Sequence, residues 1–313
     1  MHSRSVSPLV YASVGDPVLS LTNPIKCRTK ALIELKEAFW KQLPSSVWKD
    51  PVMFLRSYED PKDVELVGFL AATLAFGSVS VLKGRLEALF LALGPSPWQS
   101  LCHYDRERTR LTDALSGWKY RFIPSEALIR LLGGLARILQ AHGSLEALFM
   151  EEYLGSGDVW AASGAFLKRL RQEAVSKGQS LGRSILFLLP QGNASPLKRL
   201  NLFLRWMVRK DGFDHGLWKG IPKDRLFAPL DTHVFRLGRQ LGLIQAKTPG
   251  KKACIQLTEA FLEACPEDPL SFDMPLSHFG MMRTCSNRFE PGVCRACPLK
   301  PVCMLAQPEP SEG

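Results

Sequence analysis

Apolar residues recur three and four positions apart along most of this chain, and this spacing constrains the fold more than any other feature. Leu32, Leu35 and Phe39 are one example. Such spacing places apolar side chains on one face of an α-helix, whereas the alternation typical of strands is nearly absent. The sequence therefore predicts an all-α protein. Helices are expected at about 28–43, 63–76, 79–93, 106–114, 125–141, 144–150, 158–176, 180–188, 196–209, 231–242 and 251–264.

The composition indicates a globular protein with a polyanionic partner. The formal net charge is +10, which favours nucleic acid ahead of an anionic membrane surface, because no basic amphipathic helix is evident. The chain lacks a long apolar run and a secretory signal, so we expect a cytoplasmic protein, in the bacterial cytosol or nucleoid. Residues 1–27 show no regular period and are expected to form a poorly structured extension.

Four cysteines near the C-terminus, Cys285, Cys294, Cys297 and Cys303, are separated by eight, two and five residues. In a reducing compartment, clustered cysteines are more often metal or cluster ligands than disulfide partners. Four thiolates suit either a [4Fe-4S] cluster or a tetrahedral zinc ion. Zinc sites usually pair two Cys-x-x-Cys turns and only one is present here, so we favour the cluster and keep zinc as the alternative.

The segment LPQGNASPLKRLNLFLRWMVRKDG, residues 189–212, is strongly cationic. At 100° per residue, Lys198, Arg205 and Arg209 lie within about 20° of one line along a helix. From residue 198 to residue 225, eight basic and three acidic residues give a net charge of +5. A surface of this kind attracts phosphates, so we expect Arg199, Arg205 and Arg209 to bind DNA.

Lys198 and Asp231 each allow an ordinary and a catalytic interpretation. Asp231 precedes an expected helix, where an Asp side chain usually caps the first backbone N–H groups, and position alone favours that role. A lysine beside an arginine is usually solvated. However, neighbouring cations favour the neutral form of an amine, and a neutral amine is the nucleophile that imine chemistry at a sugar carbon requires.

Three stretches carry a family resemblance: DPVMFLRSYEDPKDVELVGFLAATLAFG from Asp50, RWMVRKDGFDHGLWKGIP from Arg205, and PLDTHVFRLGRQLGL from Pro229. Together with the cysteine loop, they resemble the helix-hairpin-helix DNA glycosylases of the endonuclease III type. In particular, they resemble a bacterial family of uncharacterised function that is distantly related to those enzymes. The similarity runs from about Asp50 to Cys303.

The resemblance implies an activity and its residues. It implies a DNA base-excision repair glycosylase with abasic-site lyase activity, in which Lys198 is the nucleophile and Asp231 its carboxylate partner. It also implies that the four C-terminal cysteines hold a [4Fe-4S] cluster. The implied partner is double-stranded DNA with one nucleotide swung out of the stack. We expect a monomer without membrane association.

The resemblance also implies two helical lobes with a cleft between them. One lobe would be discontinuous, joining residues 28–60 to residues 196–305, and would carry the hairpin and the cysteine loop. The other would be a helical barrel formed by residues 61–195. Residues 306–313 would form a tail.

Three features depart from endonuclease III, and one of them is the first gap between the clustered cysteines, which is eight residues here and typically six in the bacterial enzymes. The hairpin of that family usually has two glycines flanking one residue, and this chain has only Gly192 there. Lys198 and Asp231 are 33 positions apart, a wider spacing that is similar to that of the archaeal 8-oxoguanine glycosylases. Alternatives therefore stay open. Lys210, Lys219 or Lys223 could supply the amine, and the scaffold could bind DNA or RNA without any chemistry.

Aromatic residues at two places could line a base pocket or fill the gap left by an extruded nucleotide. These residues are Phe76, at the end of an expected helix, and Trp118, Tyr120 and Phe122 in the sequence WKYRF. Aromatic residues with apolar neighbours are usually interior, so the sequence favours core packing for all four.

Overall fold

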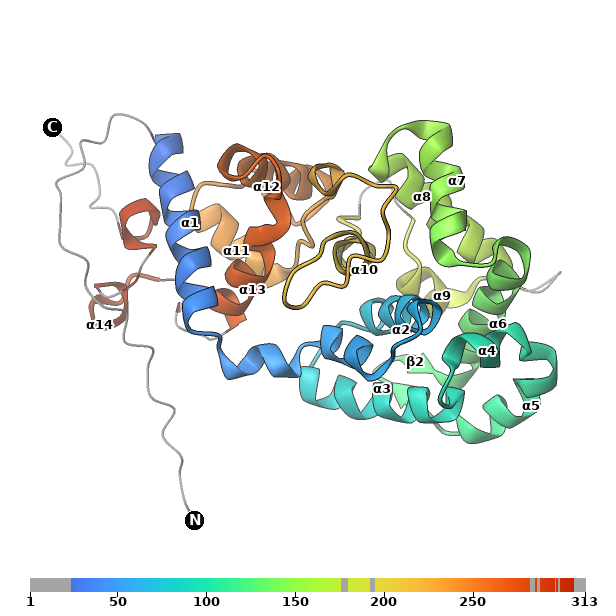
Figure 1. Ribbon diagram of the computed structural model, residues 1–313. Coiled ribbons are helices and arrows are strands. Elements are labelled where there is room, and N and C mark those ends of the chain that lie inside the picture. The colour runs from blue at the N-terminus through green and yellow to red at the C-terminus, as the bar shows by residue number, and fades with distance from the viewer. Residues whose placement is uncertain are drawn as a thin grey trace, which may run out of the picture.

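A computed structural model of the protein describes residues 24–175, 180–191, 195–281, 285, 288–295, 297 and 299–306. The described residues are mostly helical, which confirms the prediction of an all-α protein (Figure 1). The α-helices are α1 (Pro24–Lys41), α2 (Pro61–Thr73), α3 (Val79–Leu93), α4 (Pro97–Cys102), α5 (Tyr104–Ala114), α6 (Ser125–His142), α7 (Leu145–Ser156), α8 (Val159–Glu173), α9 (Gly182–Leu188), α10 (Lys198–Val208), α11 (Thr232–Gln240), α12 (Lys251–Ala264), α13 (Asp273–Met281) and α14 (Pro291–Cys294).

Short elements connect these helices. One antiparallel pair of strands places Tyr120 opposite Ile123. The strands are β1 (Lys119–Tyr120) and β2 (Ile123–Pro124), and the 3₁₀ helices are η1 (Ser45–Lys49), η2 (Pro51–Ser57), η3 (Lys223–Arg225), η4 (Pro269–Phe272) and η5 (Lys300–Val302). None of the helices in the described ranges is long and apolar enough to cross a membrane.

The predicted helices are all present, but some of their ends differ. The expected extension is wrong over its last four residues, because α1 already begins at Pro24, and proline is well tolerated in the first turn of a helix. Residues 1–23 and 307–313 lie outside the described part. The helix predicted at 144–150 continues to Ser156 and ends at Gly157, whose φ of 67° provides a left-handed cap.

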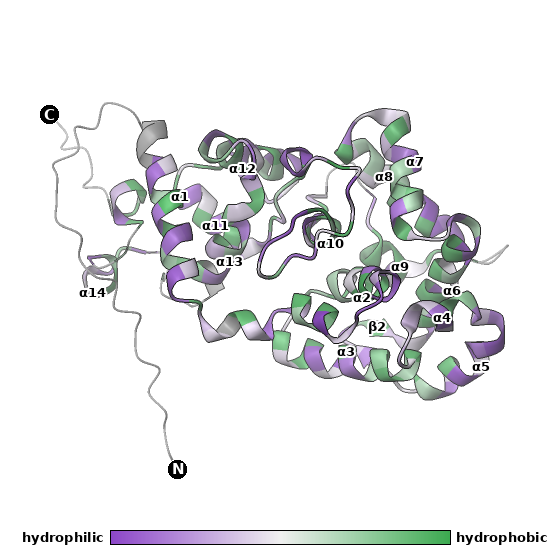
Figure 2. Cartoon of the chain, in the orientation of Figure 1, coloured by the Kyte–Doolittle hydropathy of each residue, from purple (hydrophilic) through white to green (hydrophobic). Residues whose placement is uncertain are grey.

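Helix α2 lies at the centre of the molecule and positions α10. Eleven of its thirteen residues, from Asp63 to Thr73, are buried, so it has no solvent-facing side there. Helix α10 packs directly against it, with the rings of Phe69 and Phe203 edge to face at 5.3 Å. Gly68 lies at this contact, where a Cβ atom would lie 3.0 Å from the end of the Met207 side chain. Surface helices differ: α5 is largely hydrophilic (Figure 2), and only Tyr104 and Leu111 of its residues are buried.

The N-terminal helix lies with the C-terminal part of the chain. Helix α1 packs against α12, α13, η4 and η5, and α6, α7 and α8 pack together at the other end of the molecule (Figure 1). Helices α2 and α10 are in contact although the predicted lobe boundary separates them. The division into a discontinuous lobe and a barrel lobe stays a prediction.

Candidate active site

Lys198 is the first residue of α10, and the chain enters that helix through a sharp turn. Leu197 has a φ of 49°, in the left-handed region that residues with a Cβ atom adopt at a cost of roughly 1–2 kcal/mol. Burial of its side chain offsets this cost, and the Asn201 side chain donates a hydrogen bond to the Pro196 carbonyl at 3.1 Å. Backbone strain of this kind is often found at functional sites. Gly192 of the expected hairpin lies outside the described residues.

Asp231 performs the capping role and also faces Lys198. Its Oδ1 accepts a hydrogen bond from the backbone N–H of Val234 at 2.8 Å, which caps α11. Its Oδ2 lies 3.5 Å from Lys198 Nζ. The Lys198 side chain is 32% exposed and that of Asp231 is 19% exposed, so the amine remains accessible. The fold thus brings together an amine and a carboxylate that are 33 positions apart in the sequence.

Both residues line a large pocket. Its volume of about 730 Å³ lies in the range of small-molecule sites and is large enough for a nucleoside. Residues of α2, α3, α8, α9, α10, α11 and α13 line it. Among the lysines of the described residues, Lys198 lines this pocket. The alternative lysines Lys210, Lys219 and Lys223 do not reach it.

Arg199 forms a cationic part of the pocket wall. Its Nη1 donates to the Thr73 carbonyl at 3.1 Å, Nη2 donates to the Phe187 carbonyl, and the guanidinium lies 4.4 Å from the centre of the Phe187 ring. No carboxylate of the described residues lies within ion-pairing distance of it. Burial lowers the pKa of Arg199 to about 10. An anionic ligand in the pocket would therefore gain from this charge.

Three aromatic side chains form a cluster beside Arg199. Phe76 and Phe187 line the pocket, and Phe122 contacts both rings, at 5.9 Å and 4.7 Å between centroids. Phe122 is 50% exposed and Phe187 37% exposed, so the expectation of core packing is wrong for Phe122. Trp118 and Tyr120 are buried, as expected for core residues. We call Phe76, Phe122 and Phe187 the aromatic rim.

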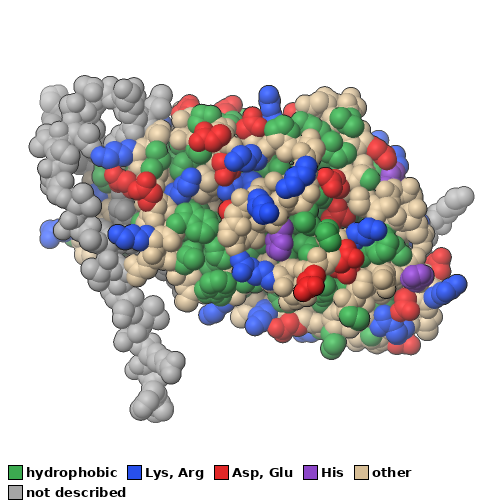
Figure 3. Space-filling model, in the orientation of Figure 1, with side chains coloured by type: hydrophobic (Ala, Val, Ile, Leu, Met, Phe, Trp, Pro, Cys, Tyr) green, Lys and Arg blue, Asp and Glu red, His purple; other side chains and the backbone are tan. Residues whose placement is uncertain are grey.

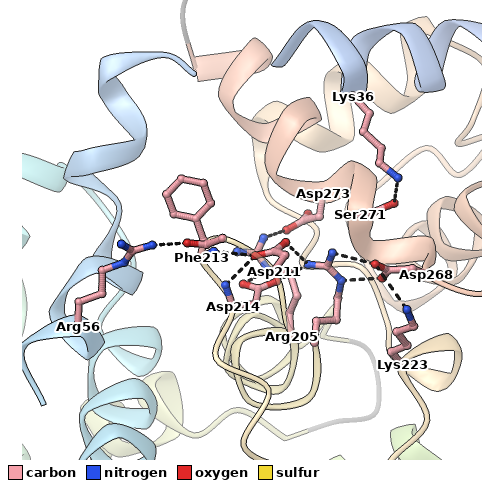
Figure 4. Close-up of polar contacts among 12 residues, drawn as sticks. Lys36, Arg56, Arg205, Asp211, Phe213, Asp214, Lys223, Asp268, Ser271 and Asp273 are labelled. Atoms are coloured by element: carbon pink, nitrogen blue, oxygen red, sulfur yellow. Dashed lines mark hydrogen bonds and ion pairs between the residues drawn. The ribbon is translucent and has the colours of Figure 1, made fainter. Parts of the chain in front are cut away.

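The expectation that Arg205 and Arg209 bind phosphates is wrong for the conformation that the structure shows. Both side chains are buried, at 3% and 4% exposure, and both are held by carboxylates; Arg205 and the carboxylates are labelled in Figure 4. Arg205 Nε lies 3.3 Å from Asp214 and its Nη1 bonds to Asp273, while Arg209 Nε lies 2.7 Å from Asp268. These carboxylates neutralise the guanidinium charges in the interior, so neither side chain is available to DNA.

Exposed positive charge instead lies on the loop that joins α10 to α11, residues 209–231. Lys210, Lys219, Lys223 and Arg225 of this loop are exposed. Lys and Arg side chains gather near the middle of the face drawn in Figure 3. Of the three arginines expected to bind DNA, only Arg199 remains a candidate.

One acidic residue of the pocket was not predicted from the sequence. Asp273 begins α13, is 2% exposed and lines the same pocket as Lys198 and Asp231. Helix α13 has only nine residues, and Pro275 near its start resembles a helix breaker. The available signal was an acidic residue followed by a proline in the first turn, which is a common way for a helix to begin.

The four C-terminal cysteines form no disulfide and are partly buried. Burial raises the pKa of the Cys297 thiol, and the charges of Cys303, Cys285 and Cys294 raise it further. A cation or cluster bound by the four sulfur atoms would relieve this repulsion, so the set of donors fits such a group. Among the described residues, however, no group of three or more potential ligands is arranged to hold a metal ion.

Comparison with family models finds one match. The model described as "Protein of unknown function (DUF2400)" matches residues 50–282. This range includes Lys198, Asp231 and Asp273 and ends before Cys285. Comparisons with curated proteins and with solved structures find no match.

Proposed function

The chain belongs to the DUF2400 family, whose function is unknown, and we propose that it is a DNA base-excision repair glycosylase with abasic-site lyase activity. One observation carries the proposal. The Lys198 amine lies 3.5 Å from the Asp231 carboxylate on the wall of a pocket of about 730 Å³. An amine beside a carboxylate in a pocket of this size suits attack on a sugar carbon. The resemblance to endonuclease III-like enzymes supports the same activity.

Access to a base in duplex DNA requires extrusion of its nucleotide, which costs a few kcal/mol. The exposed lysines of the 209–231 loop and the guanidinium of Arg199 would offset part of this cost through contacts with phosphates. The aromatic rim would stack on a base, because phenyl rings provide flat apolar faces beside the pocket.

The reaction would begin with attack by the neutral Lys198 amine on C1′ of the deoxyribose. The C1′–N bond to the damaged base breaks, and the base leaves with the bonding electron pair and takes up a proton. The Asp231 carboxylate would stabilise the positive charge that develops on the sugar. Loss of a proton from the attached nitrogen and ring opening give a Schiff base. Loss of a proton from C2′ and cleavage of the C3′–O bond then release the 3′ phosphate.

Replacement of Asp231 by asparagine separates its two roles. Asparagine caps helices about as well as aspartate, so we expect the free energy of unfolding to change by less than about 0.5 kcal/mol. The loss of charge is expected to lower the rate of imine formation by about a hundredfold or more. The rate of imine formation is measured by stopping reactions with abasic DNA with borohydride at successive times. Asp231→Ala, which loses both the charge and the helix cap, is the comparison. If the Asp231→Asn variant formed the imine at the wild-type rate, Asp231 would only cap α11 and would have no role in the reaction.

We further propose that the cysteine loop binds a [4Fe-4S] cluster through Cys285, Cys294, Cys297 and Cys303. The cluster would hold the loop, whose Met304 N–H donates to the Gln240 carbonyl at the end of α11. Anaerobically purified protein is expected to contain about four iron atoms per chain and to absorb broadly in the visible. Cys294→Ser should lose most of the iron, whereas Cys102→Ser, outside the loop, should keep it. Stoichiometric zinc without iron would contradict the proposal and favour the alternative metal.

Oligonucleotides carrying 8-oxoguanine, oxidised pyrimidines, uracil, alkylated bases or an abasic site test the proposed activity. In the presence of borohydride, wild-type protein should become covalently attached to abasic DNA and to at least one damaged base. Tight binding to all of these oligonucleotides without any adduct or cleavage would contradict an enzyme. That result would favour the alternative of a non-catalytic iron–sulfur protein that binds nucleic acid.

A further inference from the structure

An exposed tryptophan beside the pocket has no part in the proposed reaction. All seven tryptophans belong to the described residues, and Trp48 alone is exposed, at 54% of its surface. It lies on η1, and the two residues that follow this element, Asp50 and Pro51, line the pocket. Consecutive Cα atoms are about 3.8 Å apart, so the Cα atom of Trp48 lies within about 8 Å of that of Asp50.

The Trp48 ring is held at the surface by two neighbouring side chains. Its centroid lies 5.9 Å from that of Phe213, which is buried and packs in turn against Trp40 at 5.6 Å. The guanidinium of Arg56 lies 5.8 Å from the centre of the Trp48 ring and 5.6 Å from that of Phe213. The same guanidinium donates a hydrogen bond to the Gly212 carbonyl. These contacts restrict the indole, while more than half of its surface stays open.

Two exposed cations lie next to this ring. The guanidinium of Arg56 lies over it, and Lys49 follows Trp48 in the sequence. Neither cation forms an ion pair with a carboxylate of the described residues, and Asp50, the acidic neighbour of Lys49, lies 3.8 Å from the buried His278. Both charges are therefore available to an anionic ligand, which would gain charge-assisted hydrogen bonds from them.

Stability alone does not explain an exposed indole at this place. An exposed cation–π contact adds little to stability and uses one face of the ring. Proteins that bind single-stranded nucleic acid combine aromatic side chains, on which bases stack, with cations that contact the phosphates. Trp48, Arg56 and Lys49 provide both kinds of group within one short segment, residues 48–56.

We propose that Trp48, Arg56 and Lys49 form a binding site for single-stranded DNA, in which one unpaired base stacks on the indole and the two cations contact phosphates. We call these three residues the stacking site. Beside the pocket, it would hold the strand next to an extruded nucleotide, and this purpose rests on the proposed function. Binding at the stacking site does not depend on that function, because undamaged DNA carries the same bases and phosphates.

Fluorescence anisotropy with two labelled, undamaged oligomers tests the stacking. One is single-stranded oligothymidylate, and the other has the same length but carries tetrahydrofuran analogues without bases. Wild-type protein should bind the oligothymidylate about tenfold more tightly, because only this oligomer provides a base to stack. Trp48→Ala should lose the preference, and Trp48→Phe, which keeps an aromatic ring, should retain most of it. Equal affinities of wild-type protein for the two oligomers, or an unchanged preference in Trp48→Ala, would overturn the proposal.

Arg56→Gln tests the cation, with Lys62→Gln as the matched control. Lys62 also lies over a tryptophan ring, that of Trp98, at 4.1 Å, but neither of these residues lines the pocket. Along α2, Lys62 is about 16 Å from Thr73, which does line it. Arg56→Gln should weaken the binding of both oligomers about threefold and reduce the salt slope by about 0.7, the value for one phosphate contact on a single strand. Equal effects of the two substitutions would contradict a phosphate contact at Arg56.

Photocrosslinking needs no substitution and decides the question if a Trp48 variant fails to fold. Irradiation links 5-iodouracil in a single-stranded oligonucleotide to aromatic side chains in contact with it, and mass spectrometry of the digested adduct should locate a link at Trp48. Links at other residues only, or no link at all, overturn the proposal. Borohydride trapping on abasic DNA is scored separately. A link at Trp48 without trapping refutes the proposed activity alone, and trapping without this link refutes the stacking site alone.

Discussion

Replacement of Lys198 by alanine is expected to abolish covalent trapping on abasic DNA and to lower the rate of strand cleavage by at least about a thousandfold. The nitrogen of the Lys198 amine forms the bond to C1′, and no other group replaces this nitrogen when the side chain is removed. Protein stability should change little. The ion pair with Asp231 is partly exposed, and such pairs contribute about 0–1 kcal/mol.

Lys210→Ala is the matched control for this prediction. Lys210 is exposed on the 209–231 loop and does not line the pocket, so its loss should weaken DNA binding slightly and leave the trapping rate at saturating DNA unchanged. Rates are measured by gel separation of protein–DNA adducts over time. A Lys198→Ala variant that traps as fast as wild type would remove this lysine from the mechanism.

Replacement of Arg205 by methionine is expected to reduce the free energy of unfolding by about 3–5 kcal/mol. Arg205 joins two buried carboxylates, Asp214 and Asp273, which belong to the 209–231 loop and to α13 (Figure 4). Methionine fills a similar volume but leaves the Asp273 carboxylate without its cation, whereas Asp214 keeps its ion pair with Arg209. Buried charges without a partner are strongly destabilising.

Arg236→Met serves as the control for this substitution. Arg236 is exposed on α11, and exposed substitutions usually change stability by less than about 0.5 kcal/mol. Urea unfolding followed by circular dichroism gives both values. If the two variants were equally stable, the buried network of carboxylates and guanidinium groups would not hold the pocket wall together.

The same arginines show what the sequence could and could not predict. The helical wheel placed Lys198, Arg205 and Arg209 along one line, but α10 ends at Val208, and the wheel could not show that Arg205 and Arg209 are buried. One acidic partner, Asp214, follows within nine positions, but Asp268 and Asp273 follow 59 and 68 positions after the arginines that they bind. A count of charges along 28 residues indicates a cationic segment, whereas only tertiary contacts show that two of its arginines are neutralised in the interior.

The pairing of Lys198 with Asp231 was expected from a resemblance and not from spacing, since a separation of 33 positions leaves the distance between two side chains undetermined. The residues between them form part of the core. Trp218 is buried and its Nε1 donates to Glu65 of α2 at 2.9 Å. The 209–231 loop is thereby fixed against the central helix, which in turn fixes the distance between the starts of α10 and α11. Periodicity does not detect a loop that packs like a secondary-structure element.

The central claim is that the Lys198 amine forms the covalent bond to DNA, and the position of the bond can be measured directly. Wild-type protein trapped by borohydride on abasic DNA is digested with nuclease and protease, and the modified peptide is sequenced by mass spectrometry. The account predicts the sugar remnant on Lys198, in the pocket beside Asp231. A remnant on Lys210, Lys219 or Lys223, or no adduct on any lesion, would contradict it.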